Sequence, residues 1–399
     1  MQIENNRSIW TFAFTGYMFM TVVICSGVSV IVPAIPNIMR EQGISAGFIT
    51  AAFVSLLTGR FLSSIFTGYL LLRVRPQQLL YTSFALHTLT MAFLAFAQGG
   101  SAFTTLRFLE GIFEGIVSVV LQVIVIALST PEDRGVKMGY MQSAFGVGFI
   151  VGPMIGSLSM RQYGSSGVFW AVAGLMVICI IWLTLIFRSL SGQMTQSPPQ
   201  KLTFSLDFLK FIPFYSAPIL QRLLVVAFAM LIPLYLVDRF HLASHQIGYF
   251  FTLSAVITST TMPFTGKLGK HPCCNYFVVA AMLVMGLSIL GMGVTSDPII
   301  FTACFVAETF GFAVMAPNSM KIFGDVVSEH PRRGEVVGTS SSFRELLNIV
   351  LSFALIPLYQ FSMSLPWIIL AMVCMLLSLP YLRNARRGER VAARVPSGS

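Results

Sequence analysis

Charged residues are scarce in this sequence. Only 10% of its 399 residues are Asp, Glu, Lys or Arg, whereas 55% are hydrophobic. A soluble domain carries roughly 25% charged residues, because its surface faces water. The composition therefore excludes a soluble globular protein and predicts an integral membrane protein, in keeping with a mean hydropathy of +0.80.

Patterns of catalytic and metal-binding residues are also missing. The chain has only five His and six Cys, and the cysteines lie mostly in apolar runs without metal-ligand spacing. His241 and His245 are four residues apart, but Leu242 stands where a zinc protease has its glutamate. Gly146 and Gly148 lack the spacing and the preceding strand of a nucleotide-binding loop. We therefore expect no metal, cofactor or nucleic acid, and no motif favours an enzyme or a receptor.

Long apolar runs are what the chain has instead. Twelve segments are long enough, at about 20 residues, to cross a hydrocarbon core of roughly 30 Å. The first is too long for the apolar core of a signal peptide and is interpreted as a span. The spans are predicted at residues 10–36, 48–72, 79–97, 103–128, 138–160, 168–187, 210–237, 246–268, 276–295, 299–321, 337–361 and 365–383.

The polar segments that connect the spans indicate that the chain has two halves. The longest polar interval follows span six, and each half has a short basic connection after its second span, at 72–76 and 266–272. Such matching features are typical of a duplicated six-helix unit. The predicted organisation is an N-terminal six-helix bundle at 1–187, a cytoplasmic linker at 188–209, a C-terminal six-helix bundle at 210–383 and a basic cytoplasmic tail at 384–399.

The distribution of Lys and Arg predicts the orientation. With both termini inside, 18 of the 25 basic residues fall on cytoplasmic segments and three on the opposite side, as the positive-inside rule requires. This bias explains the net charge of +10 without nucleic acid. The expected location is a bacterial cytoplasmic (inner) membrane, with the basic tail solvated or lying against anionic lipid headgroups.

Three charges share one stripe of the fourth span. Arg107, Glu110 and Glu114 fall within about 60° of one another on a helix, so they face one side. A charge inside a membrane is costly unless it faces protein or a water-filled cavity. Arg107 is placed to pair with Glu110 at i+3, which leaves Glu114 less directly compensated.

The fifth span carries three glycines on one face. Gly148, Gly152 and Gly156 are spaced by four, so a neighbouring helix can approach the bare backbone closely. Pro153 removes one internal hydrogen bond and makes a bend. Ordinary helix packing is the alternative explanation of the glycines, but the Gly-Pro pair favours a specific motif.

These features resemble the major facilitator superfamily, and specifically its drug-proton antiporter branch. The antiporter motif G-x-x-x-G-P-x-x-G-G matches residues 148–157 except for Ser157, and the R-x-x-Q-G pattern is similar to Arg107 with Glu110-Gly111. The resemblance implies an all-α membrane protein with twelve transmembrane helices in two pseudo-symmetric six-helix bundles. It also implies transport of a small molecule by a chain that works as a monomer.

Two positions depart from that family. Its cytoplasmic motif G-x-L-x-D-R-x-G-R-R corresponds here to the segment from Gly68 through Arg73 to Gln77, but Leu72 replaces the aspartate. Some drug exporters also have an acidic residue in span one, nine residues before a proline; Gly27 stands at that offset from Pro36. Neither position therefore supplies a carboxylate.

Other charges lie inside the remaining spans, and with the stripe on span four they make four Arg and four Glu, a balanced set that can pair across a cavity. Arg344 and Glu345 are adjacent and point about 100° apart, so one of them is expected to be structural. For Arg60, a structural ion pair and a substrate role stay equally open, and His87 is interpreted as a hydrogen-bonded helix contact. The additional charged positions are Arg60, Arg222, Glu308, Arg344 and Glu345.

These charges suggest a mechanism. A proton-coupled transporter needs a group that gains and loses a proton, and a carboxylate away from water is suited to this. Glu114 is the first candidate, with Glu110 and Glu308 after it. The predicted function is a proton-driven antiporter exporting a drug, siderophore or metabolite. The alternative is uptake of an anionic solute bound by Arg60, Arg107 and Arg222.

Overall fold

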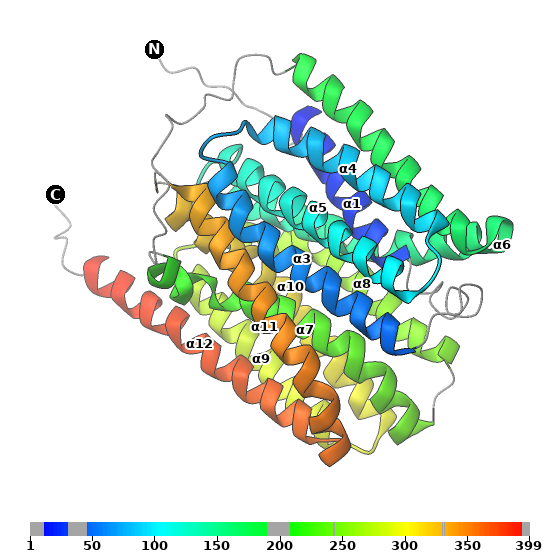
Figure 1. Ribbon diagram of the computed structural model, residues 1–399. Helices are drawn as coiled ribbons and strands as arrows, with labels where there is room; N and C mark the ends of the chain where they lie inside the picture. The colour runs from blue at the N-terminus through cyan, green and yellow to red at the C-terminus, as the bar shows by residue number, and fades with distance from the viewer. Residues whose placement is uncertain are drawn as a thin grey trace, which may run out of the picture. The chain divides into compact units, whose positions relative to one another are not determined.

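The structure is a computed structural model that describes residues 12–30, 46–189, 208–241, 244–328, 330 and 332–392. Within these ranges every regular element is a helix (Figure 1). The helices are α1 (Phe12–Val30), α3 (Ala46–Leu70), α4 (Pro76–Phe96), α5 (Gly100–Ala127), α6 (Arg134–Ser189), α7 (Phe208–Phe240), α8 (Ser244–Thr265), the 3₁₀ helix η2 (Gly266–Lys270), α9 (Cys274–Val294), α10 (Pro298–Ser328), α11 (Arg333–Phe361) and α12 (Leu365–Ala392).

Each predicted span overlaps one of these helices. In the described ranges, ten segments are long and apolar enough to cross a membrane, and α1 contains a shorter apolar stretch at Ala13–Gly27. Predicted spans five and six both belong to α6, which is interrupted at Gly164. The φ of Gly164 is 68°, a conformation that favours glycine because it has no Cβ atom. The resulting change in direction of α6 is visible in Figure 1.

The last helix continues beyond the last apolar span. The last helix, α12, continues through Ala392, well past the predicted end of span twelve at residue 383. The segment from Arg383 to Ala392 is rich in Arg and Ala, which are strong helix formers, so the helix continues beyond the apolar span. The remaining residues, 393–399, lie outside the described ranges.

The chain divides into two compact units. The first unit comprises Met1–Thr130, Ala144–Ser205 and His330–Leu346, and the second comprises Pro131–Ser143, Leu206–Glu329 and Leu347–Ser399. The start of α6 is thus grouped with the second unit and the start of α11 with the first. The division into bundles at 1–187 and 210–383 remains a prediction, and most of the predicted linker lies outside the described residues.

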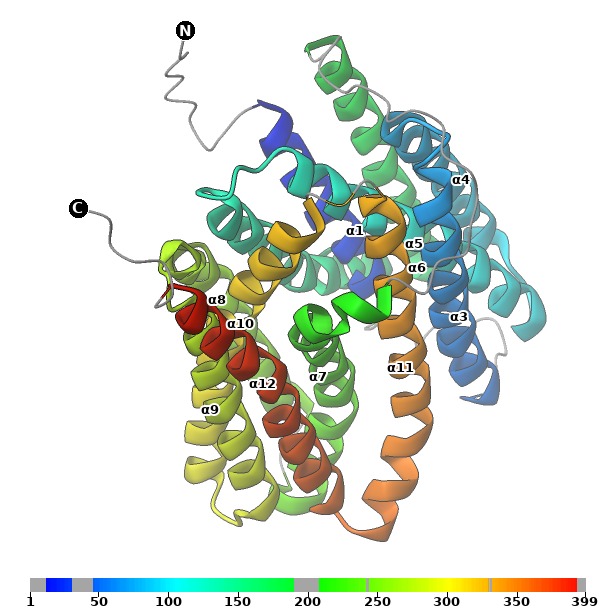
Figure 2. The ribbon, with the colours of Figure 1, turned by 90° about the vertical axis from the view of Figure 1, so that its left-hand side faces the viewer.

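Aromatic side chains fill the core of the second unit. Tyr235 of α7 stacks on Phe301 of α10, with ring centroids 5.6 Å apart. Trp367 of α12 meets both rings edge-on and is fully buried. Figures 1 and 2 show α12 running beside α9, and a Cβ atom added at Gly293 of α9 would lie 2.3 Å from the Cβ of Trp367. The absence of a side chain at this glycine lets α12 pack closely on α9.

The glycine face of α6 packs against α1 in the first unit. A Cβ atom added at Gly152 would lie 2.0 Å from Ser29 Oγ, and one at Gly156 would lie 2.1 Å from the carbonyl oxygen of Val30. The hydroxyl of Ser29 donates a hydrogen bond to the Gly148 carbonyl at 3.2 Å. The close approach predicted from the spacing of these glycines is therefore confirmed.

The contact with α1 predicts that α6 does not tolerate a methyl group at Gly156. Gly156→Ala would force the new Cβ atom into the Val30 carbonyl, and overpacking of this kind costs about 1–3 kcal/mol. We expect the thermal unfolding midpoint of the purified protein to fall by several degrees. Gly174→Ala, on the same helix, is the matched control because its Cβ atom meets nothing within 4 Å. Equal midpoints for the two variants would contradict the packing described here.

Candidate functional site

Close contact between α3 and α5 brings two charged side chains together. A Cβ atom added at Gly111 would lie 2.1 Å from the Leu56 carbonyl oxygen, and one at Gly59 would lie 2.3 Å from the Phe108 carbonyl oxygen. A Cβ atom at Gly115, one turn further along α5, would come within 3.1 Å of the Cα of Arg60. Small residues on both helices thus let the two backbones touch. Side chains next to the contact, including Arg60 and Glu114, are therefore held within reach of one another.

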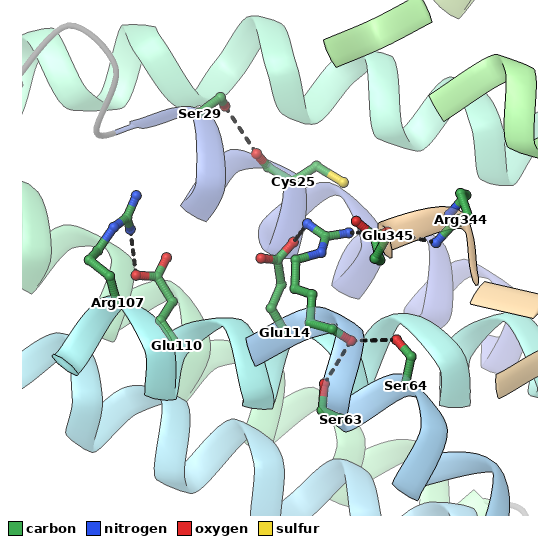
Figure 3. A network of polar contacts seen from close by, with 10 residues as sticks. Cys25, Ser29, Ser63, Ser64, Arg107, Glu110, Glu114, Arg344 and Glu345 are labelled. Carbon is green, nitrogen blue, oxygen red and sulfur yellow. Dashed lines mark hydrogen bonds and ion pairs between the residues drawn. The ribbon is translucent and has the colours of Figure 1, made fainter. Parts of the chain in front are cut away.

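Arg60 joins three helices through two carboxylates. Its guanidinium donates to Glu114 Oε1 of α5 at 2.5 Å and lies 3.6 Å from Glu345 Oε1 of α11. All three residues are buried, with exposed fractions of 6%, 3% and 1%. Figure 3 shows the labelled side chains of Glu114 and Glu345 pointing toward one another. Removing one partner of such a buried pair strongly destabilises the fold, because it leaves an uncompensated buried charge.

A second arginine completes the charge balance. Arg344 lies beside Glu345 on α11, and its guanidinium donates to Glu345 Oε1 at 3.1 Å. The adjacent residues leave the helix in different directions, but the long arginine side chain turns toward the carboxylate (Figure 3). Two arginines and two glutamates therefore form one buried network, which we call the Arg60 network: Arg60, Glu114, Arg344 and Glu345.

Glu114 is more closely paired than the sequence indicated. On its own helix the nearest cation is Arg107, seven residues away, and this spacing predicts that Glu114 is less directly compensated than Glu110. That interpretation is corrected by the ion pair with Arg60, which comes from another helix and leaves no trace in the spacing of α5. One oxygen, Glu114 Oε2, is shielded from solvent and has no hydrogen-bond partner among the described residues.

Arg107 and Glu110 form the ion pair that their i, i+3 spacing predicts. Both side chains are buried on α5, and the Arg107 guanidinium lies 5.9 Å from the ring centroid of Phe53 on α3. His87 of α4 is also buried, but neither ring nitrogen has a hydrogen-bond partner in the described part of the chain. The prediction that His87 makes a hydrogen bond is therefore wrong within the described part of the chain.

The remaining candidate charges belong to the second unit. Arg222 is half-buried on α7, and Glu308 is buried on α10 within electrostatic range of the Cys374 thiol on α12. No ion pair holds Glu308 among the described residues, in contrast to Glu110 and Glu114. The roles assigned to Arg222 and Glu308 from sequence stay predictions.

The modified cytoplasmic motif still contacts α11. A Cβ atom added at Gly68 would lie 2.9 Å from the Gly334 carbonyl oxygen, so α3 and α11 touch through their backbones. Leu72, which replaces the aspartate of the motif, is buried, and Arg73 is exposed. The acidic group at this contact comes from α11 itself, where Glu335 is buried in the first turn. A carboxylate there is favourable because it lies near the positive end of the helix dipole.

Comparisons with known proteins agree with this architecture. The Major Facilitator Superfamily profile matches residues 17–230 and 214–397. The chain is 22% identical to quinolone resistance protein NorA of Staphylococcus aureus (strain MSSA476) over 357 residues, which cover 86% of this chain and 88% of NorA. It is 19% identical to multidrug resistance protein 2 of Bacillus subtilis (strain 168) over 340 residues, 81% of this chain and 82% of that protein.

A solved structure shows the same fold. The crystal structure of the human organic anion transporter MFSD10 (TETRAN) superimposes with a TM-score of 0.77 at 16% sequence identity, covering 93% of this chain and 99% of that one. The apolar helices, the glycine contacts and these similarities agree with the resemblance seen in span five. The chain belongs to the Major Facilitator Superfamily and is an integral membrane transporter rather than an enzyme.

Proposed function

We propose that the protein is a proton-driven antiporter that exports a small organic solute by alternating access. The proposal places it in a bacterial inner membrane with both termini in the cytoplasm. It is supported by the match of residues 148–157, including Pro153, to the antiporter motif and by the names of two relatives, which are drug resistance proteins. The observation that carries it is the Arg60 network, in which Glu114 Oε2 has no hydrogen-bond partner among the described residues.

Protonation of Glu114 is the proposed coupling step. While Glu114 is charged, Arg60 is shared between carboxylates on α5 and α11, and the contact with Glu114 is the shorter one. A proton on Glu114 removes the negative charge and weakens that contact, so the ion pair of Arg60 with Glu345 becomes the dominant one. The same proton thereby changes the attraction between α3 and α5, which shifts the balance between conformations.

We propose that two helix contacts made through glycine residues are the surfaces that move. Each contact lies next to one of the short basic connections. In the first unit, Gly68 of α3 touches Gly334 of α11. In the second unit, a Cβ atom at Gly135 of α6 would lie 2.4 Å from the Gly266 carbonyl oxygen. Each contact joins a segment from one half of the sequence to a segment from the other. We propose that both contacts separate and re-form as the predicted six-helix bundles rock.

The alternative, uptake of an anionic solute, receives less support. It is favoured by the description of MFSD10 as an organic anion transporter. Arg60 and Arg107 are each paired with a glutamate, however, so neither is available to a substrate anion without breaking an ion pair. Transport into right-side-out versus inverted vesicles distinguishes the two directions.

Glu114→Gln should uncouple transport from protons. The amide keeps the size and a hydrogen-bonding oxygen for Arg60 but cannot take up a proton. In proteoliposomes, with a fluorescent quinolone or ethidium as the probe, we expect accumulation driven by an imposed pH gradient to fall at least tenfold. Exchange of the same probe without a gradient should persist.

Glu132→Gln is the matched control for this experiment because Glu132 is exposed in the turn before α6. Its coupled transport should equal that of the unmodified protein. Undiminished accumulation by Glu114→Gln would exclude Glu114 as the proton carrier, and coupled uptake in the opposite direction would favour the importer.

The charge balance of the Arg60 network predicts a rescue. Arg60→Met leaves two glutamates with one arginine in a buried site, and loss of one partner of a buried ion pair costs about 3–5 kcal/mol. Adding Glu114→Leu restores the balance, because Arg344 and Glu345 still pair. The thermal unfolding midpoint should therefore fall strongly in the single variant and recover in part in the double variant. Additive losses would show that the pair is not coupled.

A further inference from the structure

A cavity lies in the second unit, and none of its lining residues belongs to the Arg60 network. It has a volume of about 600 Å³ and is formed by η2, the start of α9, the last turns of α10 and the end of the apolar part of α12. Its polar lining residues are Lys270, His271, Asn275, Lys321, Asp325 and Asn384. The proposed transport mechanism uses none of them.

The cavity has an excess of positive charge. Asp325, its one acidic lining residue, accepts a hydrogen bond from Lys321 Nζ at 2.6 Å and also pairs with Arg134. Its negative charge is therefore already compensated by two cations. Lys270, an exposed residue on η2, adds a further positive charge. An anion entering the cavity meets attraction rather than repulsion.

Two hydrogen-bonding groups in the cavity have no partner within the described part of the chain. Asn275 Oδ1 and Asn384 Nδ2 are shielded from solvent and make no hydrogen bond to the described residues. The amide group of an asparagine can turn, so each can present its NH₂ group. His271 Nδ1 accepts a hydrogen bond from the Cys273 backbone at 3.3 Å, so a neutral imidazole carries its proton on Nε2 and is a donor there. Unmet polar groups of this kind are costly unless a ligand or water satisfies them.

We propose that this cavity binds a phosphate group. Phosphate offers several acceptor oxygens and negative charge to the ammonium of Lys270, the imidazole of His271 and the amide of Asn384. The helix α9 begins at Cys274 in the cavity wall, with the positive end of its dipole toward an anion.

The cavity lies at a depth in the membrane where a phosphate group from either of two sources can reach it. It lies where the apolar segments Cys274–Val294 and Leu365–Ala385 end, which is the depth of lipid headgroups in a membrane. A free phosphate can reach the same place from the aqueous side. In both cases the bound phosphate contacts both η2 and α12. Because η2 begins at Gly266, which touches Gly135, occupancy of the cavity stabilises one of the proposed moving surfaces.

The test measures thermal unfolding of the full-length, delipidated protein in detergent. The probes are inorganic phosphate, compared with chloride at equal ionic strength, and dihexanoyl phosphatidylglycerol, compared with dihexanoylglycerol, which has no phosphate. Ligand that binds the folded state raises the unfolding midpoint. We expect a rise of several degrees with at least one phosphate probe. A rise with the lipid alone identifies a headgroup, and a rise with inorganic phosphate identifies free phosphate.

Two cavity variants and one matched control locate the effect. Lys270→Gln and Asn384→Leu should each reduce the phosphate-induced rise to less than half. Lys267→Gln is the control, because Lys267 is also on η2 but lies over the Phe264 ring, 5.5 Å from its centroid, outside the cavity. The phosphate-induced rise in the unfolding midpoint of Lys267→Gln should match that of the unmodified protein. Absence of any rise with both phosphate probes, or equal reductions in Lys270→Gln and Lys267→Gln, would overturn the proposal.

Discussion

Direct contact between the backbones of α3 and α5 is the constraint on which the buried charges depend. Gly59 and Gly111 remove the side chains that would hold these helices apart, and the Arg60 guanidinium then reaches Glu114 at 2.5 Å. In a membrane, apolar side chains gain little by leaving lipid, so close packing of small residues and polar contacts provide much of the association between helices. The glycines and the ion pair therefore stabilise the same interface.

The sequence predicts most of the helices because a membrane imposes a simple pattern. Twelve apolar segments are visible without knowledge of their contacts, and each overlaps a helix in the described ranges. The helical extension of α12 beyond residue 383 is not visible in the hydropathy pattern, because hydropathy reports burial in lipid and not helix propensity. The assignment of the start of α11 to the first unit also depends on tertiary contacts, which hydropathy does not encode.

The site was predictable only where its contacts are local. The pairing of Arg107 with Glu110 follows from helix periodicity, and the structure contains it. Arg60 and Glu114 are 54 residues apart, and Arg60 and Glu345 lie still farther apart in the chain, so no spacing rule connects them. A weak signal was present nonetheless. Gly111 and Gly115 are spaced by four, as are Gly59 and Ser63, which indicates close helix packing at Arg60.

The difference between local and long-range pairs also supports the proposal that Glu114, rather than Glu110, is the proton carrier on α5. Glu110 and its cation are on one helix, so their ion pair does not itself join two helices. Glu114 has its cation on α3, and that cation is shared with α11. In the proposed mechanism, a proton on Glu114 therefore alters the attraction between helices. A change of this kind can shift the balance between two conformations, which the proposed coupling requires.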